Sequence, residues 1–440
     1  MLEIRGEVSR RGFMTLGGLG LAGLTAGRLA QARAGSPSTN TAVILFWMAG
    51  GPSHLDTYDM KPAAPAEIRG PFRAVQTRLP GLRVNELMPG HARIAPRLSL
   101  VRSLHHSLPV HDDASHWVQT GYPLVNARQR GQVNPSQGSV IARLRGPNQK
   151  GMPPYVCIPE AYSSPRGFYQ RSAYLGSRHD PLNAGGDPSL GNYRTPDFSL
   201  SADVTLPRLE SRRELIRQID GAMRNLESRA DMHSLGEMQQ EAFTLLAGKK
   251  IREAFDVSRE PLALRERYGR HAYGQSALLA RRMVEAGVTF VTINLYEADV
   301  DWWDDHTHIE KNLRQRLPRF DQALATLIDD LADRGLANRV LVAAFGEFGR
   351  TPRINTAGAG RDHWPRAMTA LLSGGGIQGG RIIGGTTSDG GEPRDRPLVP
   401  GNLLASIYRV VGIDPETTFL DRQNRPVRLV EAGRPIDELF

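Results

Sequence analysis

The sequence predicts an α/β fold in which a mostly parallel central sheet is sandwiched between helices. Three observations support this prediction: continuous apolar runs rich in β-branched and aromatic residues, helical patterns between several of these runs, and turns that carry histidines and acids directly beside them. The length of 440 residues, with 40% hydrophobic and 23% charged residues, is typical of a globular protein. The single cysteine, Cys157, excludes a disulfide scaffold and a thiolate-rich metal site.

The first element along the chain is an export signal that is not part of the fold. Residues 9–14 (SRRGFM) put an arginine pair ahead of an apolar, glycine-rich stretch over 16–27. That stretch is shorter than the roughly 20 residues that cross a bilayer as a helix. The pattern resembles a twin-arginine signal peptide over residues 1–34 and predicts a periplasmic or secreted protein. We expect the mature chain, residues 35–440, to be one α/β domain with no transmembrane segment.

The strands of the sheet are predicted from apolar runs. Residues 42–49 (AVILFWMA) are bounded by Gly50-Gly51-Pro52 and indicate a strand that is buried on both faces, as in parallel sheets. Four later runs have the same character, the first of them more weakly: 98–104, 288–295, 340–345 and 368–372. The helical patterns between several of these runs favour helices on both faces of the sheet.

The clearest helix is predicted over 312–335, where apolar residues recur at spacings of three and four. Pro318 either kinks this helix or marks its start. Residues 206–268 are polar and helix-favouring, and we interpret them as a helical insertion in the domain. Residues 123–200 are rich in Gly, Pro, Ser and Asn, which predicts long loops with short strands.

The formal charge of +9 does not by itself indicate a nucleic-acid-binding protein. The 55 basic residues are scattered singly, and no basic patch or known nucleic-acid-binding module is visible. A basic surface would equally attract an anionic substrate. We therefore expect no nucleic-acid partner and a small anionic substrate.

Five segments rich in histidine and acid stand beside the predicted strands: 50–56, 105–116, 301–308, 346–350 and 360–365. They hold eight of the twelve histidines, which is too many for random surface placement. Four of them follow a strand. Ligands of open parallel sheets bind beyond the carboxyl ends of the strands, so we expect these four segments to meet in one crevice.

Imidazoles and carboxylates gathered in this way supply ligands for a divalent ion such as Zn, Mn, Mg or Ca. The candidate ligands are the histidines and acids of the strand-end segments: His54, Asp56, Asp304, His306, Glu347, Asp362 and His363. His54 and Asp56 are equally consistent with turn and helix-cap roles, and Glu347 has an alternative as an ion-pair partner of Arg350 or Arg353. Arg350 suits bidentate contact with a phosphate or sulfate, although most arginines are solvated.

Several long motifs resemble a bacterial family, the domain of unknown function 1501 (DUF1501), which is grouped with the alkaline phosphatase and sulfatase superfamily. The motifs that carry this resemblance are GGPSHLDTYDMKP (50–62), REPLALRERYG (259–269), ARRMVEAGVTFVT (280–292), GEFGRTPRIN (346–355) and GRDHWP (360–365). The resemblance covers nearly the whole mature chain. It implies the central sheet of sulfatases, alkaline phosphatases and cofactor-independent phosphoglycerate mutases.

The resemblance also suggests catalytic roles. In that superfamily a serine, threonine or modified cysteine nucleophile precedes a Thr-Gly pair, which is similar to Thr120-Gly121 here, and Ser115 offers the one hydroxyl in 111–116. The superfamily's Asp-His-Gly motif is similar to Glu347-Phe348-Gly349, and its distal metal-binding histidine resembles His363. The candidate catalytic residues are Ser115, His111 and Arg350.

Two hypotheses of function remain. The first is an exported metal-dependent hydrolase of phosphate or sulfate esters, in which Asp304, His306 and His363 hold one metal. His54, Asp56 and Glu347 hold or flank a second metal. The attacking group is water or Ser115. The second is a non-catalytic metal- or anion-binding protein that retains the fold. We favour the enzyme because so many ionisable groups are costly to bury without a partner.

The export signal can be tested by a double substitution. Changing Arg10 and Arg11 to lysine should leave unprocessed precursor in the cytoplasm, because the arginine pair is what the twin-arginine machinery reads. Immunoblots of cytoplasmic and exported fractions measure the precursor and the mature chain. Normal processing and export of the double variant would remove the twin-arginine assignment.

Overall fold

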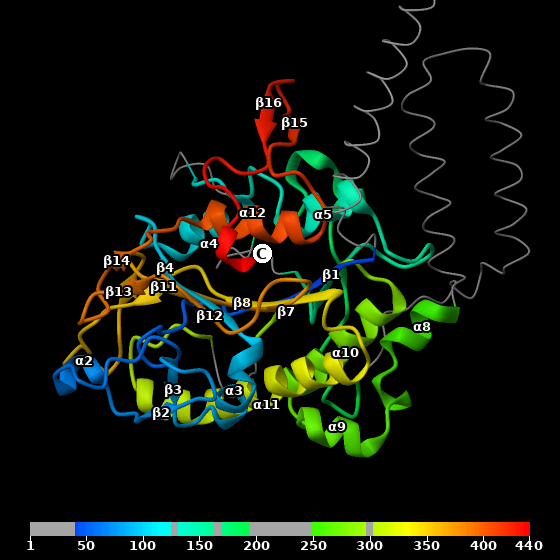
Figure 1. Ribbon diagram of the computed structural model, residues 1–440. Coiled ribbons are helices and arrows are strands. Elements are labelled where there is room, and N and C mark those ends of the chain that lie inside the picture. The colour runs from blue at the N-terminus through cyan, green and yellow to red at the C-terminus, as the bar shows by residue number, and fades with distance from the viewer. Residues whose placement is uncertain (1–39, 125–130, 162–168, 194–248, 296–301) are drawn as a thin grey trace, which may run out of the picture. The chain divides into compact units, whose positions relative to one another are not determined.

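The computed structural model describes residues 40–124, 131–161, 169–193, 249–295 and 302–440. At its centre lies an eight-stranded sheet with the order β12-β4-β11-β8-β1-β7-β5-β6 (Figure 1). Its strands are β1 (Ala42–Trp47), β4 (Ser99–Leu104), β5 (Tyr155–Ile158), β6 (Leu182–Asn183), β7 (Phe290–Asn294), β8 (Val340–Phe345), β11 (Met368–Gly374) and β12 (Arg381–Ile383). The predicted α/β fold with a mostly parallel sheet between helices is confirmed. The predicted export signal lies outside the described residues.

One central strand runs against the others. β11 pairs antiparallel with β8 on one side and with β4 on the other. A strand that is buried on both faces carries the same apolar signature in either direction, so its sequence did not distinguish the two orientations. The reversed direction places the start of β11 at the carboxyl edge of β8, with Met368 opposite Leu104. Residues 360–365, which precede β11, therefore reach the edge where the other four segments lie.

The sheet separates two hydrophobic cores. Along β1, Ile44 and Phe46 belong to one core while Val43, Leu45 and Trp47 belong to the other, as the alternation of a buried strand requires. The first core is covered by α3 (Pro89–Ile94), α8 (Lys249–Phe255), α9 (Leu262–Tyr268), α10 (Ala272–Ala286) and α11 (Ile309–Asp333). The second is covered by α4 (His111–Thr120), α5 (Gln137–Arg145) and α12 (Pro400–Val410). No helix in the described parts of the chain is both long and apolar enough to cross a membrane.

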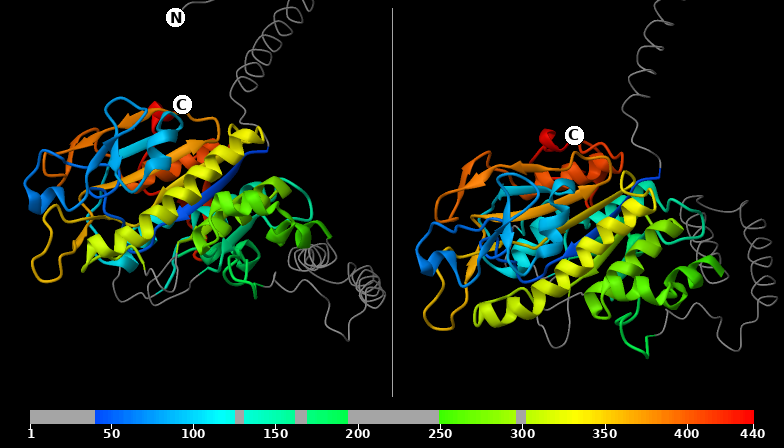
Figure 2. Two further views of the ribbon diagram at one scale, coloured as in Figure 1. Left: turned by 90° about the horizontal axis from the view of Figure 1, so that it is seen from below. Right: turned by 60° about the horizontal axis from the view of Figure 1, so that its bottom comes forward.

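The long helix α11 runs along one face of the sheet (Figure 2). It begins at Ile309, so Pro318 lies inside the helix and does not mark its start. Phe320 packs edge-on against Phe46 and Trp303, with ring centroids 6.1 Å and 5.4 Å apart. Trp303 directly precedes a candidate ligand, so α11 fixes that part of the site.

The other α-helices and strands of the described residues are short. They are α2 (Ala66–Arg69) and four two-stranded pairs: β2 (Ala74–Gln76) with β3 (Arg83–Asn85), β9 (Gly349–Arg350) with β10 (His363–Trp364), β13 (Gly385–Thr386) with β14 (Pro393–Asp395), and β15 (Thr418–Leu420) with β16 (Pro426–Arg428). Within 123–200, a region expected to hold loops and short strands, α5 is an additional helix. It forms because the Ser136 hydroxyl accepts a hydrogen bond from Ser139 N and caps its first turn.

His116 fastens the end of α4 to the chain that follows. Its Nδ1 donates to the carbonyl of Tyr122 at 2.7 Å, and its Nε2 accepts from the backbone N–H of Val133 at 3.2 Å. The side chain is fully buried. Burial lowers the pKa of His116 to about 4, although the bond to Tyr122 opposes this shift. The imidazole is therefore neutral in the folded protein near pH 7.

Acid should destabilise the protein partly through His116. Its pKa is near 6.5 when unfolded and about 4 when folded, so the unfolded state binds the extra proton and stability falls as pH decreases from 6.5 to 4. One such group contributes a slope of up to about 1.4 kcal/mol per pH unit in that range. Urea unfolding at several pH values should show a smaller slope for His116→Gln than for wild type. Equal slopes would show that His116 is not a source of acid sensitivity.

Candidate metal centre and active site

The turn after β1 packs closely against the segments that follow β7 and β8. Gly50 and Gly51 have φ angles of +105° and +82°, which favour glycine. A Cβ at Gly50 would lie 2.6 Å from Asp304 N, and a Cβ at Gly51 would lie 2.4 Å from the Phe348 ring. The N–H of Gly50 donates to Glu347 Oε1 at 2.9 Å. The glycine pair therefore lets the segments after β7 and β8 approach the end of β1.

The buried side chain of Arg350 links these segments through hydrogen bonds. Its guanidinium is fully buried and donates to the carbonyls of Gly51 at 2.8 Å and Arg361 at 2.9 Å. Its Nη2 donates to the Trp303 carbonyl at 3.2 Å, to the Gly50 carbonyl, and to Asp304 Oδ1 at 2.5 Å. The sequence suggested that Arg350 faces a substrate anion, whereas the structure directs its donors to protein oxygens. Arg350 orients Asp304.

The segments that carry His306 and His363 are fastened to each other by backbone hydrogen bonds. His308 N donates to Gly358 O at 2.7 Å, and Arg361 N donates to Asp305 O at 2.9 Å. A Cβ at Gly360 would lie 2.2 Å from the carbonyl of His306, so glycine allows this close approach. These contacts fix the spacing between the two histidines.

Three imidazoles converge on Asp304. His306 Nε2 and His363 Nε2 lie 3.1 Å and 3.3 Å from Asp304 Oδ1, and His111 Nε2 lies 3.2 Å from Asp304 Oδ2. The Nε2 atoms of His306 and His363 are 2.9 Å apart. Ligand atoms of His111, Asp304 and His363 all lie within 4.8 Å of one another, as a metal site requires. The structure thus brings together Asp304, His306 and His363, and it adds His111.

Each of these imidazoles has its other nitrogen bound to an oxygen. His111 Nδ1 pairs with Glu347 Oε1 at 2.6 Å, His306 Nδ1 with Asp362 Oδ1 at 2.7 Å, and His363 Nδ1 with the Pro109 carbonyl at 2.7 Å. Carboxylate and carbonyl oxygens accept hydrogen bonds, so Nδ1 carries the hydrogen in all three rings. In the neutral tautomer, the Nε2 lone pairs face Asp304. Histidines that bind metals have this arrangement, with the second nitrogen donating to a carboxylate or carbonyl.

The charges at this centre are strongly coupled. Burial lowers the pKa of His111, but hydrogen bonds and charges of Asp304 and Glu347 outweigh it and raise that pKa to about 9. Burial disfavours the charged form of Asp304, yet the side chains of His111 and His363 and the guanidinium of Arg350 hold its pKa far below the ordinary range. Without a cation, His111 therefore carries a proton beside an ionised Asp304. A divalent ion would replace that proton, because ligand imidazoles bind metals in the neutral form.

His54 and Asp56 contact other partners. Asp56 is fully buried and forms an ion pair with Arg361, with Nε and Oδ2 2.7 Å apart. Arg361 thus supplies the positive charge that a metal would supply. His54 Nε2 donates to the carbonyl of Gly390 at 2.9 Å, and its Nδ1 lies close to the backbone of Gly349. Burial lowers the pKa of His54 and favours the neutral ring.

The remaining candidates lie around the three imidazoles. Glu347 is buried, and its Oε1 accepts a hydrogen bond from His111 Nδ1. Its Oε2 has no hydrogen-bond partner among the described residues. Asp362 is half exposed and lies on the solvent side of His306. Ser115 is buried one helical turn after His111 on the same face of α4.

Sequence reasoning assigned His111 to catalysis and did not place it among the metal ligands. Its position at the start of α4, directly after the loop from β4, could have indicated a ligand role, because β4 ends at the same edge. The Pro109 carbonyl and Arg361 gave no such signal, and the sequence pointed Arg350 at a substrate anion and not at Asp304. A backbone acceptor has no sequence signature, and arginine is frequent in this chain.

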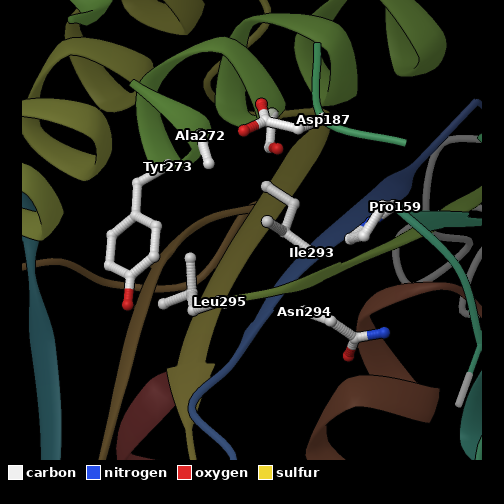
Figure 3. A pocket seen from close by; sticks show the side chains of 8 residues that line it. Pro159, Asp187, Ala272, Tyr273, Ile293, Asn294 and Leu295 are labelled. Atoms are coloured by element: carbon white, nitrogen blue, oxygen red, sulfur yellow. The ribbon is translucent and has the colours of Figure 1, made fainter. Parts of the chain in front are cut away.

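A small cavity lies beside the ends of β5 and β7. Figure 3 shows Ala272 and Tyr273 of α10 together with Ile293, Leu295 and Asp187 among the residues that line it. None of the three imidazoles or Asp304 lines this cavity. It is therefore separate from the candidate metal centre.

Solved structures with similar folds include hydrolases. The sulfatase PsFucS1 from Pseudoalteromonas sp. is 11% identical, with a TM-score of 0.37 and coverage of 88% of this chain and 70% of that chain. The phosphonate monoester hydrolase SpPMH from Silicibacter pomeroyi is 11% identical, with a TM-score of 0.34 and coverage of 90% and 76%. A protein in the alkaline phosphatase superfamily from Vibrio parahaemolyticus is 10% identical, with a TM-score of 0.35 and coverage of 86% and 69%.

The comparison with curated proteins gives no match. The comparison with protein families gives a match over residues 40–440, which include every described residue and all five strand-end segments. The chain therefore belongs to the family described as "Protein of unknown function (DUF1501)".

Proposed function

We propose that this protein is an exported metal-dependent hydrolase of phosphate or sulfate esters, with one divalent ion held by His111, Asp304, His306 and His363. The observation that carries the proposal is the orientation of the three imidazoles. Each has Nδ1 hydrogen-bonded to an oxygen and Nε2 within 3.3 Å of an Asp304 oxygen. In the tautomer with the hydrogen on Nδ1, the Nε2 lone pairs of His306 and His363 face each other 2.9 Å apart, and a cation between them would remove this repulsion.

The donor set favours a borderline transition ion. Three imidazole nitrogens and one carboxylate suit Zn²⁺ or Mn²⁺ better than Ca²⁺ or Mg²⁺, which prefer oxygen ligands. A tetrahedral site with bonds of 2.0–2.1 Å has ligand atoms about 3.3 Å apart. His306 Nε2, His363 Nε2 and Asp304 Oδ1 lie 2.9–3.3 Å apart, close to that spacing, and His111 Nε2 lies 3.2 Å from the other Asp304 oxygen.

The side chains around the proposed ion have different roles. A bound divalent ion would polarise an ester oxygen and lower the pKa of water at the site. Arg350 holds Asp304 in place, and Glu347 fixes the direction of the His111 ring. The side chains of His306 and Asp362 are the more exposed members, at 41% and 55%, so this side is the entry for substrate and water. Ser115 lies deeper, within α4, so we infer that water attacks.

The proposed substrate and location are supported by two separate features. A phosphate or sulfate ester brings the negative charge that a metal with three neutral imidazoles and one carboxylate can accept. The arginine pair near the N-terminus supports export by the twin-arginine route, which carries folded proteins. The alternative, a binding protein without turnover, becomes an outcome of the experiments below.

Removing the exposed imidazole should abolish metal-dependent hydrolysis. His306→Ala takes away one ligand, so metal content per chain and hydrolysis of aryl phosphates or sulfates should both fall by at least about 100-fold. Elemental analysis and ester assays measure the two effects. Chelator should lower the Tm of wild type but not of the variant, because mass action stabilises only the protein that binds metal.

The matched control is His308→Asn, two residues along the same loop. His308 is exposed, and asparagine tolerates its left-handed backbone with φ of +52°. The control should keep its metal and activity. Equal chelator sensitivity in wild type and His306→Ala would show that His306 is not a ligand. A wild type that binds metal but hydrolyses neither ester class would favour the binding protein.

Ser115 separates attack by water from attack by serine. If water attacks, Ser115→Ala should keep its metal and retain kcat within about 10-fold of wild type, since one buried hydroxyl contributes little to the metal site. Steady-state kinetics with an aryl ester measure this. A loss of 1,000-fold or more with unchanged metal content would instead identify Ser115 as the nucleophile.

A further inference from the structure

Phe348 lies against two of the three imidazoles. Its ring centroid is 4.6 Å from that of His363 and 5.0 Å from that of His111, with interplanar angles of 36° and 34°. The Phe348 side chain is completely buried. One aromatic ring thus lies beside both His111 and His363, whose own centroids are 4.2 Å apart.

The Phe348 ring is itself held in place from two sides. A Cβ at Gly51 would lie 2.4 Å from Phe348 Cδ2, so the ring packs directly against the glycine backbone. The guanidinium of Arg350 lies 5.9 Å from the ring centroid. Phe348 is also flanked in sequence by Glu347 and Gly349, which are themselves buried. The ring therefore has little freedom to move away from the imidazoles.

The ring contacts and the hydrogen bonds constrain different motions. A hydrogen bond through Nδ1 sets the direction of an imidazole within its plane, but it permits tilt about the bond axis. Contact with the Phe348 ring resists that tilt, because either imidazole would have to move against a ring whose centroid is only 4.6 Å or 5.0 Å away. His306 has no such contact with Phe348 among those the structure gives, and its orientation depends on Asp362.

We propose that Phe348 is a positioning residue of the metal centre, which sets the tilt of His111 and His363 and keeps water from the faces of these rings. This inference rests on the proposed metal centre. Apolar groups around a metal site control solvent access, and partners that orient the ligands affect metal affinity by about 10- to 100-fold. Phe348 therefore acts through the two imidazoles and does not itself touch the ion.

The test compares two buried phenylalanines. Phe348→Leu removes the ring beneath the imidazoles, and Phe345→Leu removes an equally buried ring that packs against Trp47, with centroids 6.0 Å apart. Titration with Co²⁺ gives the Kd and the visible spectrum, which reports ligand geometry. Phe348→Leu should bind Co²⁺ at least about 10-fold more weakly with a shifted spectrum. Phe345→Leu should keep the wild-type Kd and spectrum while losing a similar amount of thermal stability.

Each result has a distinct meaning. If wild type binds no Co²⁺ or Zn²⁺, the proposed metal centre itself fails. If wild type binds and the two leucine variants match it in Kd and spectrum, the positioning role of Phe348 is wrong. If Phe348→Leu does not fold, Phe348→Met keeps more of the side-chain volume without the ring and takes its place. Weaker binding with an unchanged spectrum in both leucine variants would indicate a general loss of stability and would also overturn the inference.

Discussion

The buried guanidinium of Arg350 is the interaction on which the site depends. A buried charge is costly unless it is paired and its donors are satisfied. Arg350 meets both conditions through Asp304 and the carbonyls of Gly50, Gly51, Trp303 and Arg361. The segments after β1, β7 and β8 and the segment before β10 are thereby tied to one side chain. The same carboxylate that balances this charge is the centre of the proposed metal site, so the fold and the proposed function would share one ion pair.

A second buried pair complements the first. Arg361 and Asp56 are both fully buried, and Arg361 also donates to the carbonyl of Ile68 at 2.8 Å. It connects the loop after β1 to the segment that carries His363. Removing one partner of such a pair would leave an uncompensated buried charge, which costs about 3–5 kcal/mol. Two arginines thus organise the strand ends, and they do so by binding protein oxygens.

The fold could be predicted from the sequence more completely than the site. Runs such as 42–49 and 340–345 gave reliable strands because burial on both faces demands continuous apolar residues. The direction of β11 was not encoded in its own residues, since an apolar run reads the same in either orientation. Histidine and acid content pointed to the edge of the sheet at which Asp304 and the three imidazoles lie. It did not separate Asp56, which an arginine neutralises, from Asp304, which faces three imidazoles. That difference depends on which arginine reaches which acid, a tertiary contact between residues far apart in the chain.

The pairing of the buried arginines with protein oxygens also limits how an anionic substrate could be bound. Arg350 and Arg361 lie near the centre, but both are fully buried and donate to protein oxygens. The groups that face the more exposed side are His306 and the half-exposed Asp362. A carboxylate at the rim disfavours a second negative charge nearby, whereas a divalent ion with neutral imidazoles attracts one. In the proposed hydrolase, binding of a phosphate or sulfate group would therefore depend on the metal, which would serve recognition as well as reaction.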